Sequence, residues 1–201
     1  MFSRGTGGCA IFLDGSDRDR FLRCLSVVTE RYAWRLHFFC VLGTHFHLYF
    51  TTPEANLAEG MRDLLGAYCR WFNRKYGRRG HLIERRYTSV LVEDEAHALQ
   101  LVPYLALNPV RAGVARRPED WPWSSYAALI GEAPPWPFVD ERWLLELFDP
   151  SPARARVLIR ELVEEELERD RAVAAAAVAT AAAARSTASR PVRLKLALRP
   201  S

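Results

Sequence analysis

Residues 35–52 carry the sequence RLHFFCVLGTHFHLYFTT, and this stretch decides the expected fold. Aromatic and branched residues fill 35–42 and again 45–52, which is typical of two paired β-strands. Gly43 and Thr44 separate these runs and predict a two-residue hairpin loop. Because side chains alternate between the faces of a strand, His45 and His47 are expected on one face and Phe46 on the other.

Helical periodicity flanks this hairpin on both sides. Ser16 to Asp19 resembles a capping box at a helix start, and apolar residues follow it at helical spacing. The expected elements outside the hairpin are helices over 17–33, 57–73 and 94–107 and a strand over 86–93. The last helix is predicted to end near Asn108, because the residue before Pro109 disfavours helical backbone.

The order helix, two strands, helix, strand, helix predicts an α+β fold, a ferredoxin-like antiparallel sheet with helices packed on it. Such a sheet needs a strand before the first helix, and residues 1–12 can supply only a short one. The aromatic segment Trp121 to Tyr126 is expected to pack back onto the domain.

The predicted division of the chain has three parts. Residues 1–127 form the main domain, 128–150 an aromatic and proline-rich strap, and 151–201 a charged helix followed by a low-complexity tail. The C-terminal extension is thus expected to be partly helical and partly disordered. In its helix an apolar stripe is predicted at Leu158, Leu162 and Leu167.

Composition excludes several classes of protein. Hydrophobic residues make up 49% of the 201 residues, enough for a packed core, and the net charge is +4. Four cysteines without a CxxC pair favour reduced thiols over a disulfide framework. The longest apolar tract, 172–184, is too short to cross a bilayer. The sequence therefore predicts a cytoplasmic protein with no membrane contact.

The two histidines are the first candidates for chemistry. Two neutral imidazoles side by side on one strand can hold a divalent metal. Asn108 is a candidate third ligand, because its carbonyl oxygen suits Mg²⁺ or Mn²⁺. The alternative is that Asn108 only caps the end of its helix. His37, on the preceding strand, is expected either to support the metal site or to be exposed.

Tyr104 lies four residues before Asn108, so the two share a helix face. Beside a metal-bound phosphate, a tyrosine can act as the nucleophile. The alternative is a tyrosine of the core or its rim. Pro103 precedes Tyr104, and a proline kink there would change the direction of the phenol.

A dense basic run extends from Arg70, near the end of the second predicted helix, to Arg86, at the start of the next predicted strand. Cations that follow a backbone, with aromatic rings between them, suit single-stranded nucleic acid. The alternative is a solvated charged face above core-facing aromatics. The candidate DNA-binding residues are Arg70, Arg74, Lys75, Arg78, Arg79, His81, Arg85 and Arg86.

Four segments together resemble the single-tyrosine HUH transposases, in the branch of REP-associated tyrosine transposases. The segments are 40–48, 73–82, 107–113 and 121–126, and they occur in the family's order. The resemblance implies a metal-dependent nuclease of the ferredoxin-like fold that acts on single-stranded DNA. It implies His45, His47 and Asn108 as metal ligands and Tyr104 as the nucleophile.

In such enzymes the tyrosine stays linked to the 5′ end of the DNA and releases a 3′ hydroxyl, which can later rejoin a different end. The resemblance further implies hairpin-bearing repeats as the substrate class, a nucleoid-associated location, and a monomer or homodimer. Two alternatives remain open from the sequence. One is a catalytically weakened protein that keeps only hairpin recognition, and the other is a phosphodiesterase that uses water, with Tyr104 structural.

Overall fold

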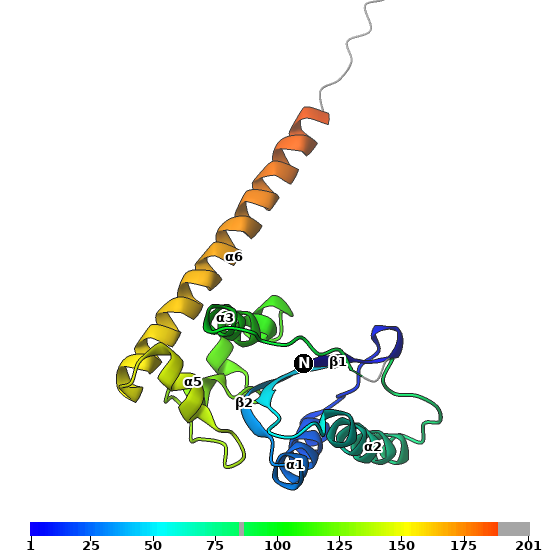
Figure 1. The fold of residues 1–201 in the computed structure, drawn as a ribbon. Coiled ribbons are helices and arrows are strands. Elements are labelled where there is room, and N and C mark those ends of the chain that lie inside the picture. Colours follow the sequence, from blue (N-terminus) through cyan, green and yellow to red (C-terminus); the bar gives the residue numbers. More distant parts are fainter. Residues whose placement is uncertain (85–86, 189–201) are drawn as a thin grey trace, which may run out of the picture. The chain divides into compact units, whose positions relative to one another are not determined.

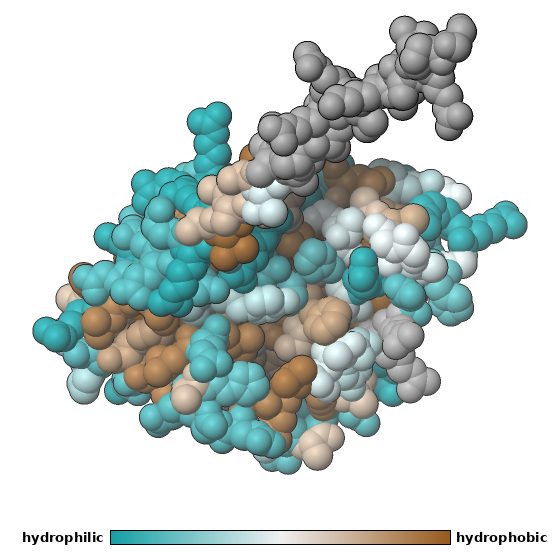
Figure 2. All heavy atoms as spheres, turned by 90° about the horizontal axis from the view of Figure 1, so that it is seen from above, coloured by the Kyte–Doolittle hydropathy of each residue, from teal (hydrophilic) through white to brown (hydrophobic). Residues whose placement is uncertain are grey.

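The computed structural model describes residues 1–84 and 87–188, with side chains described as far as residue 181 (Figure 1). Two compact units divide the chain at Val163, namely Met1–Val163 and Glu164–Ser201. The predicted boundaries at 127 and 150 both fall within the first unit. On the face seen in Figure 2, hydrophobic residues form scattered patches among hydrophilic ones, as on most water-facing surfaces.

The sheet of the first unit is antiparallel, with the strand order β1-β3-β2. Its strands are β1 (Phe2–Arg4), β2 (Arg35–Val41) and β3 (His45–Thr51). Cys40 pairs with His47 and Val41 with Phe46, which leaves Gly43 and Thr44 as the predicted two-residue loop. The α+β class is confirmed, and the short strand before the first helix lies beside β3 as a ferredoxin-like sheet requires.

The strand predicted over 86–93 is wrong for the part that the structure describes, because 87–93 form no strand. One isolated antiparallel bridge lies in its place, Phe2 with Thr88, and a second, Gly5 with Ile83, lies just before it. The physical reason is the length of β1. A three-residue strand offers few free backbone groups, so a neighbour can pair with it only at single points.

Helices cover both faces of the sheet (Figure 1). The helices α1 (Gly15–Arg31) and α2 (Leu57–Lys75) lie on one face, and α3 (Glu95–Arg111) lies on the other. On the first face, Phe46 packs against Phe21 of α1 with ring centroids 4.5 Å apart. Phe46 thus points into the core, as the alternation predicts.

The start of α1 differs from the predicted capping box at Ser16. Asp14 is the N-cap, and its Oδ1 accepts a hydrogen bond from Asp17 N at 3.0 Å. The Asp17 carboxylate in turn accepts one from Asp14 N at 3.2 Å. The capping box therefore spans 14–17, because aspartate serves as a cap as well as serine does.

The end predicted for the third helix near Asn108 is wrong, since α3 continues through Pro109 to Arg111. Pro103 and Pro109 both lie inside this helix and are buried. A proline inside a helix costs about 3 kcal/mol, but α3 buries most of its apolar residues against the sheet and neighbouring segments. Burial of this kind contributes about 1.5–3 kcal/mol per large side chain, which outweighs the local preference.

The segment 121–126 packs onto the domain as predicted, along the edge of β2 that β3 leaves free. Val41 N donates to Trp123 O at 2.9 Å, and Ser125 N donates to Phe39 O at 3.0 Å. The Trp121 indole Nε1 also donates to Val41 O at 3.0 Å. This segment therefore protects an edge that would otherwise expose unpaired backbone groups.

Short helical elements complete the description of the first unit. They are the 3₁₀ helices η1 (Thr6–Gly8) and η2 (Pro118–Asp120) and the helices α4 (Tyr126–Leu129) and α5 (Glu141–Phe148).

The last helix, α6 (Pro152–Ala188), begins in the first unit and runs into the second. Within the first unit its buried positions are Ala155, Ile159 and Val163. Leu158 and Leu162 of the predicted stripe are only half-buried, because α6 packs with the neighbouring row of its helical surface. The third predicted residue, Leu167, is buried as expected. Residues 189–201 lie outside the described residues. No helix in the described part of the chain is both long and apolar enough to cross a membrane.

Candidate metal and nucleophile site

The face of the sheet opposite α1 and α2 brings together the residues predicted for catalysis. His45 and His47 lie side by side on β3, with ring centroids 5.1 Å apart and an interplanar angle of 84°. Tyr104 reaches them from α3, and its ring centroid lies 5.7 Å from that of His47. The Tyr104 side chain is not a core residue, since it is 47% exposed.

Pro103 does not turn Tyr104 away from this face. The helix continues through the proline, and Tyr104 still contacts His47 at an angle of 90° between the rings. Pro103 itself is buried. Its ring thus packs on the interior side of α3, while the next side chain lies on the histidine side.

Asn108 sits one turn after Tyr104 and does not cap the helix, whose C-cap is Ala112. Its Nδ2 donates to Tyr104 O at 2.7 Å. A backbone carbonyl can only accept a hydrogen bond, so this contact fixes the orientation of the amide and leaves Oδ1 for a cation. Burial lowers the pKa of both histidines, and the nearby Asn108 side chain partly offsets this lowering.

Each imidazole has a nitrogen suited to a metal. Thr44 Oγ1 lies 2.9 Å from His45 Nδ1, which orients the ring and leaves Nε2 as the ligand atom. His47 Nε2 is buried and has no hydrogen-bond partner among the described residues. Buried polar atoms are nearly always paired, so this nitrogen is the strongest sign that the site takes a ligand.

The protonation states also suit metal binding. Burial, with the nearby charge of His45 as the next cause, lowers the pKa of His47 to about 3. Burial lowers the pKa of His45 as well, with Arg4 contributing. Both rings are therefore neutral at pH 7, which is the form that coordinates a metal.

The donor set is small. In the part of the chain that the structure describes, no three His, Cys, Asp or Glu side chains form a group that could hold a metal. Two imidazoles and one amide oxygen leave several coordination positions for water and substrate oxygens. A cation that keeps waters and binds phosphate, as Mg²⁺ does, fits such an open site.

The basic candidates lie elsewhere. Arg70 and Arg74 are exposed on α2, which covers the opposite face of the sheet, and Arg78, Arg79 and His81 are exposed in the loop that follows. The structure does not bring these side chains onto the face of the histidines. Arg85 and Arg86 lie outside the described residues.

Lys75 differs from the other basic candidates because its charge is partnered within the fold. Its Nζ lies 2.7 Å from Asp17 Oδ1 and 2.9 Å from Asp14 Oδ2. It also lies 5.1 Å from the centroid of the Trp71 ring. Since the Asp17 side chain is fully buried, this contact ties the end of α2 to the start of α1.

His37 is neither exposed nor part of the metal site. It is buried at an irregularity in the pairing of β2 with β3, between Leu36 and Phe38. Its Nδ1 lies 3.1 Å from Asp140 O and its Nε2 lies 2.9 Å from Thr51 Oγ1. His37 thus joins the sheet to the segment that precedes α5.

Three further residues lie next to the site, and they were not predicted from the sequence. Phe2 and Arg4 on β1 pair in register with His47 and His45, and the Arg111 guanidinium lies 5.9 Å from the Tyr104 ring centroid. The helical spacing of 104, 108 and 111 is a signal that could have indicated Arg111. Phe2 and Arg4 could be found only from the strand register.

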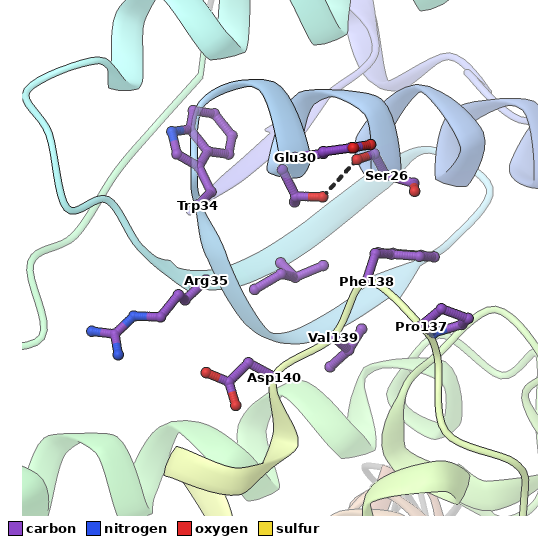
Figure 3. A pocket seen from close by; sticks show the side chains of 10 residues that line it. Ser26, Glu30, Trp34, Arg35, Pro137, Phe138, Val139 and Asp140 are labelled. Atoms are coloured by element: carbon purple, nitrogen blue, oxygen red, sulfur yellow. Dashed lines mark hydrogen bonds between the residues drawn. The ribbon is translucent and has the colours of Figure 1, made fainter.

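A pocket of about 400 Å³ lies at another place, between the end of α1, the start of β2 and residues 137–140 (Figure 3). Thr29 Oγ1 donates to Ser26 O at 2.8 Å in its wall. None of the predicted site residues lines this pocket.

Comparison with known proteins shows which family the chain resembles. The family model described as "Transposase IS200 like" matches residues 10–107. This range includes the histidine pair, Tyr104 and all the basic candidates, and Asn108 follows directly after it. The chain is thus similar to the IS200-like transposases over just under half of its length. The resemblance inferred from the four sequence segments is thereby confirmed.

The chain also resembles two individual proteins. A protein of Haemophilus influenzae named as a REP-associated tyrosine transposase is 30% identical over 109 residues, which are 48% of this chain and 61% of that protein. The match therefore spans less than two thirds of that relative. A solved structure of a REP-associated tyrosine transposase bound to a REP hairpin superposes with a TM-score of 0.56 and 19% identity, covering 70% of this chain and 84% of the other. This second likeness shows a shared fold.

Proposed function

We propose that this chain is a metal-dependent transposase that nicks and rejoins hairpin-bearing single-stranded repeat DNA through a 5′-phosphotyrosine intermediate. The observation that carries the proposal is the position of Tyr104 beside His47, whose buried Nε2 lacks a partner among the described residues. A nucleophile next to an unsatisfied ligand nitrogen is the arrangement that metal-assisted phosphoryl transfer needs.

His45 Nε2, His47 Nε2 and Asn108 Oδ1 would hold Mg²⁺ or Mn²⁺. When bound, such an ion supplies positive charge for the oxygens of the attacked phosphate. The contact of Thr44 with His45 and that of Asn108 with Tyr104 O hold two of these ligands in place before any substrate arrives.

Tyr104 performs the covalent step in this proposal. Its Oη forms a bond to phosphorus while the bond from phosphorus to the 3′ oxygen breaks. The phenol proton passes to solvent, and the departing oxygen takes up a proton to become a 3′ hydroxyl. One phosphodiester replaces another, so attack by a 3′ hydroxyl can reverse the step and join a different end. The exposure of Tyr104 leaves room for the strand.

The DNA partner is proposed from the relatives. One bears the name of a REP-associated tyrosine transposase, and the solved structure holds a REP hairpin. The exposed arginines of α2 and its following loop supply positive charge that could grip such a hairpin. A DNA substrate implies a nucleoid-associated location, with the chain acting as a monomer or homodimer.

Trapping the covalent intermediate tests the proposal directly. The purified protein is incubated with labelled hairpin DNA from the flanks of its own gene and Mg²⁺ or Mn²⁺, and denaturing gels detect a protein–DNA adduct. We expect an adduct that is lost with chelator, with Tyr104→Phe and with His47→Gln. Tyr32→Phe is the matched control, because Tyr32 lies at the end of α1 on the other face, and it should keep the adduct.

The other outcomes distinguish the alternatives. Cleavage that survives Tyr104→Phe would reject the tyrosine as nucleophile and favour water. Tight hairpin binding without cleavage or adduct, on several hairpins and with both metals, would indicate a protein that has kept only recognition.

A further inference from the structure

The strand β1 carries two side chains on the face of the metal site. Phe2 pairs in register with His47 and Arg4 with His45. Ser3, between them, points to the other side and is buried. The Phe2 ring centroid lies 6.0 Å from that of His47, and the side chain is still 37% exposed. An aromatic ring and a cation thus extend the histidine pair toward the edge of the sheet.

Arg4 is exposed and close to the site. Among the described residues it forms no ion pair with a carboxylate, and its charge is near enough to act on His45. Cations next to a phosphate-binding site raise the local concentration of anionic ligands. Arg4 is therefore available for a phosphate at the point where β1 meets β3.

The chain also connects this strand to the basic loop. Thr6 N donates to Leu82 O at 3.1 Å, and Glu84 N donates to Arg4 O at 3.2 Å. The residues just after Arg78, Arg79 and His81 therefore lie alongside 4–6. A DNA strand held by the loop would have to cross β1 to reach Tyr104 on the other face.

We infer that β1 is a nucleotide-binding subsite. In this inference, which rests on the proposed function, Phe2 stacks on a base and Arg4 contacts a backbone phosphate of the single-stranded DNA next to the scissile position. Stacking on an aromatic ring and a cation for the backbone are the two contacts by which proteins hold single strands. The Phe2 ring lies beside the histidines, and the Arg4 cation follows two residues later on the same face of β1. This spacing suits a DNA strand, in which bases and phosphates alternate.

Binding measurements can test this subsite separately from cleavage. Tyr104→Phe serves as the background, so that no covalent step occurs, and two probes are compared. The first is the hairpin with a single-stranded flank, and the second is the same hairpin without the flank. The variants are Phe2→Leu, which keeps apolar bulk without a ring, and Arg4→Gln. Arg35→Gln is the matched control, an exposed arginine on β2.

We expect Phe2→Leu to weaken binding of the flanked hairpin roughly tenfold. Arg4→Gln should lower the slope of log Kd against log salt by about 0.7, the value for one phosphate contact to a single strand. Neither variant should change binding of the hairpin without the flank, and Arg35→Gln should change neither probe. Replacing the flank bases by abasic sites should remove the effect of Phe2→Leu and keep that of Arg4→Gln.

Different failures have different meanings. Variants that bind both probes like the background protein would overturn the subsite, even if the wild-type protein forms the tyrosine adduct. Equal weakening on both probes would also overturn it, because the effect would not depend on the flank. Flank-dependent weakening in a protein that never forms an adduct would support the subsite and reject the nuclease proposal.

Discussion

Individual histidines on this sheet serve different purposes, and their hydrogen bonds decide which. His37 has a partner on each ring nitrogen, Asp140 O and Thr51 Oγ1. His47 has a buried Nε2 without a partner among the described residues. The first arrangement completes the fold, whereas the second leaves a nitrogen for a ligand.

Burial of His37 makes the stability of the protein depend on pH. Burial lowers its folded-state pKa below the ordinary 6.5. The unfolded chain therefore binds the proton first, so the stabilisation is present above pH 6.5 and is lost as the pH falls toward the folded value. The unfolding free energy should fall with a slope of up to about 1.4 kcal/mol per pH unit for this proton. His45 and His47 act in the same direction.

Chemical denaturation at pH 7.5, 6 and 5 measures this slope. His37→Gln should be less stable than the wild type at pH 7.5 but should lose less stability on acidification. His81→Gln, at an exposed position, is the control and should follow the wild type. Parallel curves for His37→Gln and the wild type would contradict the prediction.

At the scale of elements, the segment 121–126 stabilises the edge of β2. Ser125 is fully buried, and its Oγ accepts a hydrogen bond from Phe39 N at 3.1 Å. Its own backbone N donates to Phe39 O. A single serine therefore satisfies both backbone groups of a strand residue in the core.

Ser125→Ala should lower the unfolding free energy by about 1–3 kcal/mol, the cost of leaving a buried backbone N–H without its partner. Urea denaturation measures the change, and Ser89→Ala, at an exposed position, is the matched control. A loss below about 0.5 kcal/mol, the usual scatter of surface substitutions, would show that another group or water replaces the hydroxyl.

Over the whole first unit, the sheet separates two sets of polar residues. The histidines and Tyr104 lie on the side of α3, and the exposed arginines follow α2 on the other side. Binding and chemistry would thus occur on different faces, with β1 between them. Among the basic candidates, Lys75 has its charge paired with Asp14 and Asp17.

Substitutions can distinguish a basic residue that binds DNA from one whose ion pair stabilises the fold. Arg79→Gln should weaken hairpin binding and reduce the salt slope by about 0.9, the value for one contact to duplex DNA, without changing the melting temperature. Lys75→Gln should lower the melting temperature, since buried Asp17 loses its ion pair, and should change the salt slope less. Binding titrations at several salt concentrations and thermal melts of both variants measure the effects. Equal salt slopes for both variants would contradict the assignment.

Local patterns determined much of this protein. The hairpin, the opposite directions of Phe46 and the two histidines, and the shared face of Tyr104 and Asn108 all follow from periods of two and 3.6 residues. These periods depend only on backbone geometry, so one sequence suffices to predict them. The end predicted for α3 was wrong, because it used the local preference before Pro109 against the burial of the helix. The stripe predicted on α6 holds at Leu167 but is displaced by one residue at Leu158 and Leu162.

Tertiary structure decided what depends on pairing between distant segments. The register of β1 with β3 places Phe2 and Arg4 beside the histidines. The length of β1 leaves one bridge, at Thr88, in the described part of the strand expected over 86–93. The burial of His47 Nε2, which has no hydrogen-bond partner in the described part of the chain, and the ion pair of Lys75 with Asp17 likewise depend on residues far apart in the sequence. Packing and register are set by the free energy of the whole fold, and no local pattern encodes them.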